Sequence, residues 1–439
     1  MILICMIATI VISIITFLGI TLSTLFFPRI KLGKVVLDTY WIVAIIGALI
    51  LVIAQLCPLE EIKNSWTSSA AINPLKILVL FFSMTILSIF LDEVGLFKYL
   101  ASLAVSKAKN SQLTLFFALY FLVSFLTVFT SNDIVILTFT PFICFFCKRT
   151  KISPLPFLIA EFTAANTWSM MFIIGNPTNI YLATSANINF IEYFKVMAIP
   201  TLCAGFIELL LIRFLFYKQL KQPLNCEDCS VVKIESKLDL IIGVAHLGAC
   251  LIFLIISPYI GLDMWLISLI CAASLLVFII ITRLVRRKQW HFLTNSLKRL
   301  PYQLIPFVLS MSIVVIALHY QGIAGKIGEL LMPVSPVLGY GASSFIGANL
   351  LNNIPMSILF ADIPVGLETT DYYQAIYATI IGSNIGAFLT PVGALAGIMF
   401  ENLLTKYDVK YTFKQFVKYG VIISVPVIAT ALAMLFIML

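Results

Sequence analysis

Charged side chains are scarce in this sequence. Only 11% of its 439 residues are Asp, Glu, Lys or Arg, whereas 61% are hydrophobic, and the mean hydropathy is +1.07. A soluble domain of this length could not bury so large an apolar share, and repeated apolar runs of about 18 or more residues are typical of polytopic helical membrane proteins. The longest polar stretch, residues 217–237, is too short for a fused ATPase or a large catalytic domain.

Motifs of common enzyme chemistry are also missing. The three histidines do not cluster, and there is no Ser/His/Asp arrangement, Walker loop or HExxH motif. We therefore predict that the protein is not an enzyme and uses no cofactor. The net charge of +8 is explained better by membrane orientation than by nucleic-acid binding, because cytoplasmic loops collect Lys and Arg.

The nine cysteines are scattered, mostly in apolar runs, and do not resemble a disulfide framework. Two pairs are closely spaced, Cys144/Cys147 and Cys226/Cys229. One pair is only half of a tetrahedral zinc site. We expect reduced thiols and no metal centre, with a metal or metalloid at Cys226/Cys229 as the alternative.

Apolar runs separated by polar breaks predict an all-α membrane protein with ten crossings. The first run lacks the basic start and the small-residue cleavage site of a signal peptide, so we expect it to be retained as a span. The predicted crossings are residues 2–26, 39–56, 75–91, 155–185, 196–216, 238–257, 262–282, 302–319, 373–405 and 416–438.

Two further apolar segments do not read as crossings. Residues 113–147 and 338–363 each have two apolar arms around a polar tip. Arms of about 10–17 residues do not comfortably span a bilayer, so each segment is predicted to be a re-entrant helical hairpin.

The basic residues test this topology. With the N-terminus outside, nearly all of the 28 Lys and Arg residues fall in cytoplasmic loops or at cytoplasmic span ends, as the positive-inside rule requires. The exceptions are Lys63, Lys76, Lys195 and Lys326. We therefore predict a multi-pass plasma-membrane protein, surrounded by lipid, with both termini outside. Hairpin 113–147 then enters from the cytoplasm and hairpin 338–363 from outside.

The two halves of the chain repeat the same order. Residues 1–216 and 238–439, joined by a cytoplasmic linker at 217–237, each contain three spans, a hairpin, a long interrupted span and a final span. The interrupted spans are 155–185 and 373–405. Five crossings per half require the second half to be inverted, which is the architecture of many secondary transporters.

Polar residues recur at matching positions of the two halves. Asn132-Asp133 lies 220 residues before Asn352-Asn353, and Asn166 lies 218 residues before Asn384. A broken helix exposes unpaired N–H and C=O groups, which Asn, Ser, Thr and Asp side chains satisfy, and Pro suits the first turn of a restarting helix. Helix N-termini attract electron-rich oxygen ligands. The alternative is that these breaks only kink helices for packing.

We expect the four breaks to converge and to form the binding site. Gly175 and Gly393 would let a substrate approach the backbone. Asp133 is the strongest candidate for carrying a proton, because a carboxylate at membrane depth needs a partner, a cation or a proton. The predicted substrate- and ion-binding residues are Thr130, Ser131, Asn132, Asp133, Gly175, Asn176, Pro177, Thr178, Asn179, Asn352, Asn353, Pro355, Asn384, Thr390, Pro391 and Gly393.

Four other acidic residues fall within spans: Glu161, Glu208, Asp362 and Glu401. Glu401 is expected near the cytoplasmic rim, where a structural role is the simpler interpretation. Glu161 stays open between a structural and a functional role, since it lies close to the first interrupted segment.

The sequence resembles the arsenite permease (ArsB-like) branch of the ion transporter superfamily, which neighbours the NhaD-type antiporters and the citrate transporters. Four motifs carry the resemblance, which covers essentially the whole chain: "FLDEVGLFKYLA" at 90–101, "SNDIVILTFTPF" at 131–142, "NNIPMSILF" at 352–360 and "GAFLTPVGALAGIMF" at 386–400. The resemblance implies a scaffold domain that makes the contact of a homodimer, a transport domain with substrate between the hairpin tips, and in some members a soluble ATPase partner.

One motif departs from this branch. "GNPTNI" at 175–180 is similar to the anion-symporter pattern, in which such loops bind sodium and carboxylate. The leading hypothesis is proton-coupled export of trivalent arsenic or antimony hydroxide. The alternatives are a sodium-coupled di- or tricarboxylate symporter, for which no Arg or Lys is predicted at the site, and a sodium/proton antiporter. Paired inverted hairpins argue against a passive channel.

Overall fold

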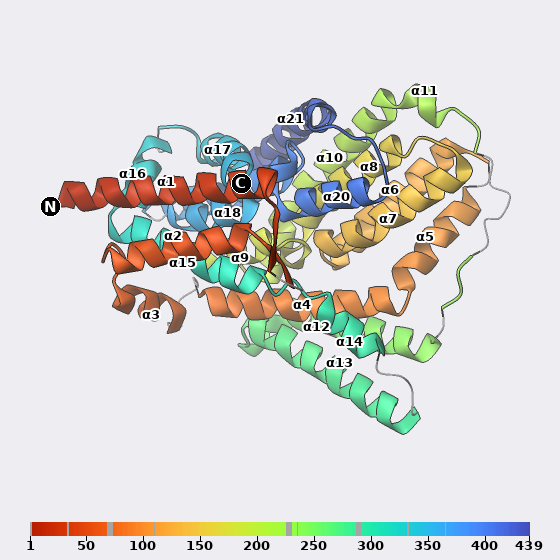
Figure 1. Ribbon diagram of the computed structural model, residues 1–439, viewed down its shortest axis with the longest axis horizontal. Coiled ribbons are helices and arrows are strands. Elements are labelled where there is room, and N and C mark those ends of the chain that lie inside the picture. The colour runs from red at the N-terminus through yellow and green to blue at the C-terminus, as the bar shows by residue number, and fades with distance from the viewer. Residues whose placement is uncertain are drawn as a thin grey trace.

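The computed structural model describes residues 2–32, 35–67, 73–108, 110–224, 231–234, 236–286, 291–331, 333–364 and 366–439, and these are helical apart from loops and one two-stranded hairpin (Figure 1). Cys226 and Cys229 lie outside the described residues. The elements of the first half are α1 (Ile2–Phe26), β1 (Arg29–Leu32), β2 (Val35–Asp38), α2 (Tyr40–Ile53), α3 (Leu59–Thr67), α4 (Pro74–Glu93), α5 (Leu96–Lys107), α6 (Gln112–Phe129), α7 (Asn132–Thr150), α8 (Leu155–Trp168), two 3₁₀ turns (Ser169–Met171 and Ile173–Gly175), α9 (Pro177–Ser185), α10 (Phe190–Leu215) and α11 (Tyr217–Leu220).

The second half has the same order of long helices. Its elements are α12 (Lys237–Ile260), α13 (Met264–Arg286), α14 (His291–Lys298), α15 (Leu304–Tyr320), α16 (Ile323–Leu331), α17 (Pro336–Leu351), α18 (Asn353–Asp362), α19 (Thr369–Gly386), a 3₁₀ turn (Pro391–Gly393), α20 (Leu395–Lys406) and α21 (Phe413–Met438).

Helix ends follow the same rules in both halves. The last long helices, α10 and α21, each begin with a capping box, in which the N-cap side chain and the side chain three residues later satisfy each other's backbone N–H. The short helices α5 and α16 each follow a glycine with a positive φ, +90° at Gly95 and +68° at Gly322, a conformation that glycine adopts without strain.

The contacts between the halves are reciprocal. Helix α2 contacts α15 while α13 contacts α4, and α7 contacts α20 while α18 contacts α9. The last helices, α10 and α21, pack against each other. When element i of one half contacts element j of the other, and j contacts i in return, the two halves are related by an approximate two-fold axis.

By length and hydropathy, seven helices of the described residues are able to cross a membrane: α1, α4, α6, α10, α12, α13 and α21. An eighth span would be the pair α15–α16, which is bent by 77°. The two interrupted spans are formed by α8–α9 and α19–α20, with 3₁₀ turns at their breaks. The protein is thus an all-α polytopic membrane protein.

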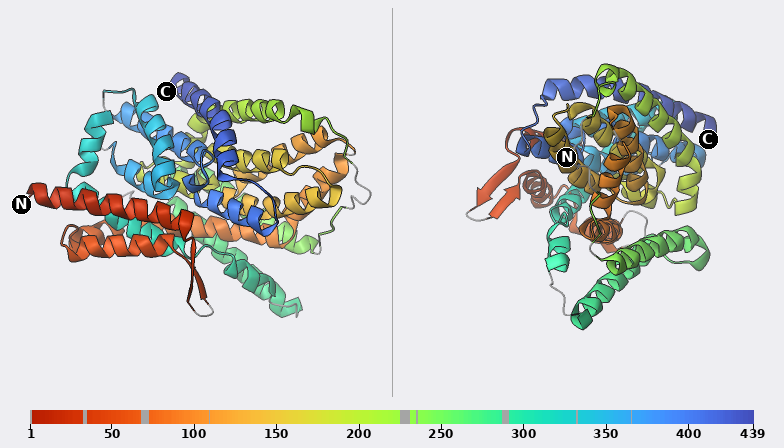
Figure 2. Two further views of the ribbon diagram at one scale, coloured as in Figure 1. Left: turned by 45° about the horizontal axis from the view of Figure 1, so that its top comes forward. Right: turned by 90° about the vertical axis from the view of Figure 1, so that its right-hand side faces the viewer.

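Three details differ from the sequence prediction. Helix α2 has 14 residues, about 21 Å, because the chain turns after Ile53 and Gln55 takes a positive φ of 56°; the predicted crossing 39–56 is therefore short. Hairpin arm α6 has 18 residues and is long enough to span, since no helix breaker precedes Thr130. Residues 29–38, which lie between the first two predicted crossings, include the β1–β2 hairpin, which projects from the helical body (Figure 2).

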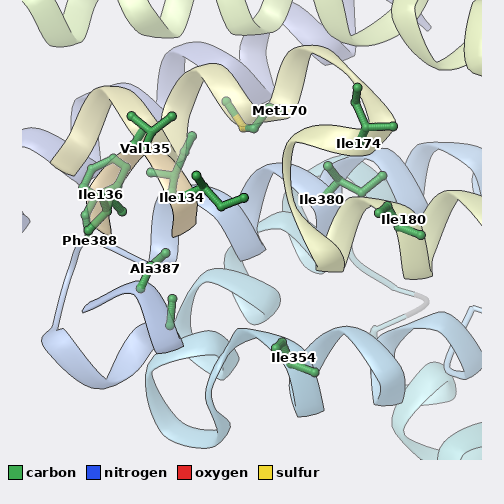
Figure 3. Packing of buried hydrophobic residues seen from close by; sticks show 14 of the residues in the cluster. Ile134, Val135, Ile136, Met170, Ile174, Ile180, Ile354, Ile380, Ala387 and Phe388 are labelled. Atoms are coloured by element: carbon green, nitrogen blue, oxygen red, sulfur yellow. The ribbon is translucent and has the colours of Figure 1, made fainter. Parts of the chain in front are cut away.

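The core is continuous through the breaks. Figure 3 shows buried apolar side chains from α7, the turns after α8, α9, α18 and α19 gathered between the interrupted helices, among them Ile134, Met170, Ile180, Ile354 and Ile380. The close contact of α17 with α19 depends on small residues. A Cβ added at Gly382 would overlap the Ser344 hydroxyl and lie 2.8 Å from the Phe345 nitrogen, so only glycine lets the two backbones approach.

Replacing Gly382 by alanine therefore tests the packing of α17 on α19. We expect Gly382→Ala to destabilise the protein by about 1–3 kcal/mol, because overpacking forces backbone shifts. The measurement is chemical unfolding in detergent. Gly248→Ala in α12 is the matched control, since a Cβ there meets no atom within 4 Å and is expected to be neutral or slightly stabilising. Equal effects of the two substitutions would contradict this account.

Candidate functional site

Four interruptions of helices lie where the sequence places its polar tips. Between α6 and α7, Thr130 and Ser131 are extended, and α7 restarts at Asn132. Between α17 and α18, the break is the single residue Asn352, with φ +72°. The interrupted span of the first half passes through two 3₁₀ turns before α9, and that of the second half passes through one before α20.

Asparagine side chains satisfy the freed backbone at the restarts. The Asn176 side-chain oxygen accepts from the Thr178 N–H at 3.2 Å, and Pro177 occupies the first helical position of α9. The Asn352 oxygen accepts from the Ile354 N–H at 3.4 Å. The Asn132 oxygen accepts from the Asp133 N–H at 2.9 Å. These contacts replace helix hydrogen bonds that lipid could not supply.

Asn384 joins the two halves. Its side-chain oxygen accepts from Ser169 Oγ at 2.9 Å and from Asn176 Nδ2 at 2.8 Å, and its Nδ2 donates to Asn179 Oδ1 at 2.6 Å. All four side chains are buried. Asn179 Nδ2 in turn donates to the Ser169 carbonyl at 2.8 Å. A residue of α19 thus fixes both sides of the break that precedes α9.

A second amide contact holds the first hairpin. Asn132 Nδ2 donates to Asn166 Oδ1 at 3.2 Å, and Asn166 Nδ2 donates to the Phe162 carbonyl at 2.8 Å. The tip of hairpin α6–α7 is therefore attached to α8. The corresponding residues Asn166 and Asn384 each donate from Nδ2 to the carbonyl four residues earlier, but their side-chain oxygens accept from different partners. The approximate symmetry of the fold therefore extends only to part of this network.

Asn349 holds the second hairpin, and the sequence analysis missed it. Its oxygen accepts from the Thr390 N–H at 3.1 Å and from Thr390 Oγ1 at 2.7 Å, while its Nδ2 donates to the Gly386 carbonyl at 3.0 Å. Asn352 Nδ2 donates to the Val392 carbonyl at 3.0 Å. The signal was present in the sequence, because Asn349 is a polar residue in an apolar run and lies three residues before the break at Asn352.

The glycines at the breaks allow the chain to pack closely against itself there. A Cβ at Gly175 would overlap the Ser169 carbonyl, and a Cβ at Gly393 would lie 2.7 Å from the Gly386 carbonyl oxygen and 2.9 Å from Asn349 Oδ1. Close approach of the protein's own atoms therefore accounts for glycine at both positions, and the approach of a substrate to them stays a prediction. The space beside each glycine is filled by the protein's own oxygen atoms.

Asp133 faces two adjoining cavities. The larger, about 380 Å³, lies between the α1–α2 connection, the segment before α15, and α20; the smaller, about 40 Å³, reaches from Asp133 to Ser131 and Thr85. Asp133 is half-buried. Within the described residues its carboxylate has no hydrogen-bond or ion-pair partner, although its backbone N–H is bonded. We call the larger space the Asp133 cavity.

Three more atoms at the tips lack partners. Ser131 Oγ, Thr178 Oγ1 and Asn353 Oδ1 are buried and make no hydrogen bond within the described chain. Buried polar atoms are normally bonded. The three atoms come from three different breaks, so each of these breaks has one buried polar atom whose hydrogen-bonding capacity is unused within the described chain.

A positive charge also lies beside Asp133, contrary to the prediction of no Arg or Lys at the site. Arg299 lines both cavities with Asp133. Its NH2 group contacts Asp92 Oδ2 and its NH1 group contacts Glu93 Oε1, each at 2.6 Å. The acidic pair in the "LDE" motif at the end of α4 was the sequence signal for a basic residue here, because buried carboxylates need a counter-ion. The motif did not indicate which residue that is, since Arg299 lies more than 200 residues away in sequence.

Three of the other acidic residues within spans have partners of their own, away from Asp133. Glu161 accepts from Thr140 at 3.1 Å and Glu208 accepts from Thr163 at 2.8 Å, both buried within helix packing. Asp362 pairs with His319 at 2.8 Å. Among the described residues, no group of three or more His, Cys, Asp or Glu side chains is placed to hold a metal, and Cys144 and Cys147 are free thiols.

Hairpins, interrupted helices and buried polar tips in two matching halves define the class of the protein, a secondary membrane transporter. The chain belongs to the CitMHS family, whose model is described as "Citrate transporter" and matches residues 39–376. A solved structure with a similar fold is that of the Alcanivorax borkumensis YdaH transporter, with a TM-score of 0.58, 13% identity, and coverage of 99% of this chain and 98% of that one.

Curated relatives carry a more specific name. An "Arsenical pump membrane protein" of Escherichia coli is 25% identical over 380 residues, which cover 81% of this chain and 84% of the relative. A "Putative arsenical pump membrane protein" of Bacillus subtilis (strain 168) is 22% identical over 374 residues, 77% of this chain and 82% of the relative. Both names describe membrane pumps and not enzymes, in agreement with the prediction that the chain is a transporter.

Substitution of Asn384 tests the link between the halves. Asn384→Ala leaves one donor, Asn176 Nδ2, and one acceptor, Asn179 Oδ1, without partners, at about 1–3 kcal/mol for each buried group, whereas the Ser169 hydroxyl keeps the Asn166 carbonyl as acceptor. We therefore expect a loss of at least about 2 kcal/mol in the free energy of unfolding, measured by chemical denaturation in detergent. Asn64→Ala on the exposed face of α3 is the control and should stay within about 0.5 kcal/mol of wild type. A stable Asn384→Ala protein would show that the network is dispensable.

Proposed function

We propose that this protein is a secondary exporter of trivalent arsenic or antimony hydroxide, driven by exchange with protons, and that Asp133 carries the proton. The observation that carries the proposal is the group of unpartnered polar atoms at the tips together with the free carboxylate of Asp133. A neutral hydroxide offers both O–H donors and oxygen acceptors, so it matches hydroxyl and amide groups without requiring a charged partner.

The charges around the smaller cavity support a neutral solute. Arg299 lines this cavity, and it is already paired with Asp92 and Glu93. Together with Asp133, three carboxylates lie near one guanidinium there, whereas Arg29 and Lys298 line only the larger cavity. A site with an excess of negative charge disfavours a multiply charged anion and favours a neutral solute, a proton or a metal cation.

The proposed binding set is the one predicted from the sequence, extended by Asn349 and Arg299. Its members have three kinds of role: Ser131, Thr178 and Asn353 would contact the solute, the asparagines of the network would fix the tips, and Asp133 would exchange the proton. The names of the arsenical pump relatives support this substrate class.

The orientation follows the basic residues. The Asp133 cavity is bordered by Arg29, Lys298 and Arg299, which belong to loops that the positive-inside rule assigns to the cytoplasm. We therefore propose that the cavity opens to the cytoplasm of a plasma-membrane protein whose termini are both outside. An exporter needs such access in order to load its solute. A homodimer and a soluble ATPase partner stay predictions from the resemblance.

A second candidate is sodium-coupled transport of a di- or tricarboxylate. It is favoured by the description of the family and by Lys298 and Arg299 at the Asp133 cavity, which would attract an anion. Sodium/proton exchange at Asp133 is the third.

The test of function is uptake into everted membrane vesicles from arsenite-sensitive cells that express the protein. We expect arsenite to accumulate only when the vesicle interior is acidified, because proton exit then drives arsenite entry. Asp133→Asn should reduce accumulation to the level of vesicles without the protein, since an amide cannot carry a proton. Asp133→Glu should keep part of the activity.

Glu60→Gln, on the exposed face of α3, is the matched control and should transport like wild type. Accumulation that persists in Asp133→Asn would exclude Asp133 as the carrier. Sodium-dependent uptake of citrate or succinate by the same vesicles, without any arsenite signal, would replace the proposal by the anion-symporter alternative.

A further inference from the structure

A second cavity lies among the elements that correspond, in the repeat, to those of the Asp133 cavity. It has a volume of about 440 Å³ and is lined by the start of α4, the end of α9 with the loop that follows, and the α12–α13 connection. The Asp133 cavity is lined by the start of α15, by α20 and by the α1–α2 connection. Each element that lines this second cavity is thus the repeat counterpart of an element that lines the Asp133 cavity. We call this space the Asp263 cavity.

The two cavities lie at opposite ends of α4. Lys76, in the first turn of α4, lines the Asp263 cavity. Asp92, in the last turn, holds Arg299 of the Asp133 cavity. A helix of 20 residues spans about 30 Å, so the two spaces are separated by roughly the thickness of the hydrocarbon core of a bilayer.

Equivalent residues meet at the two mouths. The motif Leu-Asp followed by aromatic residues occurs at Asp38–Tyr40 in one connection and at Asp263–Trp265 in the other, and Gln303 in "PYQL" corresponds to Lys76 in "PLKI". At the Asp133 cavity, the Tyr40 hydroxyl lies 3.4 Å from Gln303 Oε1, which is a weak hydrogen bond.

At the mouth of the Asp263 cavity, the corresponding residues make stronger contacts. Lys76 Nζ lies 3.2 Å from Asp263 Oδ2 and 5.9 Å from the centroid of the Trp265 ring, and Trp265 Nε1 donates to the same carboxylate oxygen at 2.8 Å. The hydrogen bond from Trp265 has the largest effect on the pKa of Asp263 and lowers it; burial opposes this effect, and Lys76 adds to the lowering. The carboxylate is therefore ionised at physiological pH.

The cavities differ in how far they reach. The Asp133 cavity includes residues of the first hairpin, Asp133 and Leu137. The residues that line the Asp263 cavity include none of the second hairpin. Ile354 and Ser357 of that hairpin instead pack with Thr178 and Phe81 around a void of only about 20 Å³, which is too small for a solute. The structure is therefore open on one side and closed on the other.

We propose that the Asp263 cavity is the second vestibule of the transport path, on the opposite membrane face, for the same small neutral hydroxide, and that the Lys76–Asp263 ion pair is the latch that holds α4 to the α12–α13 connection while this vestibule does not reach the hairpin tips. This rests on the proposed transport function. Thr184 Oγ1, which is buried at this cavity without a hydrogen bond, is a contact for the hydroxyl of the departing solute.

The Lys76–Asp263 ion pair is weak enough to break and re-form in every transport cycle. The side chains of Lys76 and Asp263 are 25% and 60% exposed, and ion pairs with such exposure are weak. Loss of the pair should shift the balance between the two open states by about two- to fivefold.

The test measures the accessibility of two reporter cysteines. Thr184→Cys reports on the Asp263 cavity and Asn402→Cys on the Asp133 cavity. Each is placed in the full-length protein in lipid nanodiscs, where both faces are open to a membrane-impermeant methanethiosulfonate reagent. Labelling rates are taken relative to the parent protein without the added cysteine, so that reaction of the natural thiols is subtracted.

Lys76→Gln installs the residue found at the corresponding position. It is expected to raise the labelling rate of Thr184→Cys by about two- to fivefold and to lower that of Asn402→Cys. The charge exchange Lys76→Asp with Asp263→Lys should restore both rates, which shows that the variants fold. Lys63→Gln, in α3 and exposed, is the matched control and should change neither rate.

Two results would overturn the proposal: faster labelling of Thr184→Cys with an unchanged rate at Asn402→Cys, which means only local loosening, and unchanged rates at both. The substrate is tested separately with arsenite uptake by the unlabelled wild type. Reciprocal labelling without arsenite transport would uphold the second vestibule and reject the proposed substrate.

Discussion

The hydrogen bonds of Asn384 connect the two halves of this transporter at a helix break, where backbone groups would otherwise lack partners. Interrupted helices expose backbone groups inside a layer that offers no water, so a break is stable only where side chains replace the lost bonds. Asn384 supplies an acceptor to Ser169 and Asn176 and a donor to Asn179, and thereby ties α19 to the break before α9. Asn349 has the same role at the second hairpin. The rest of the site depends on these amides because they position the tips.

The internal repeat determines the arrangement of the helices but not the charges at the site. The two halves exchange contacts reciprocally, yet of the two hairpin tips only the first has a carboxylate, Asp133, and only its side has the Arg299 pair with Asp92 and Glu93. An approximately symmetric frame allows two related conformations, open to either face. In the proposed mechanism, the asymmetric charges decide what is carried and which ion is exchanged, because selectivity depends on the local electrostatics at the tips.

The two vestibules show how such asymmetry is used. Corresponding positions hold Tyr40 with Gln303 at one mouth and Lys76 with Asp263 and Trp265 at the other. A neutral hydrogen bond and an ion pair differ modestly in strength. A modest difference is what a reversible cycle needs, since a strong lock on one face would trap the protein in a single state.

The sequence by itself determined the helical class, the two matching halves and the positions of the four breaks, because hydropathy, helix breakers and their recurrence are local properties of the chain. It also identified Asp133 and the asparagine tips as polar groups that lipid would not tolerate. The tertiary structure alone decided their partners: Arg299 reaches Asp92 across more than 200 residues, Asn349 bonds to Thr390, and the glycines at the breaks face carbonyls of the protein. Such pairings depend on how distant segments pack, and packing distances are not encoded in the spacing of residues along the chain.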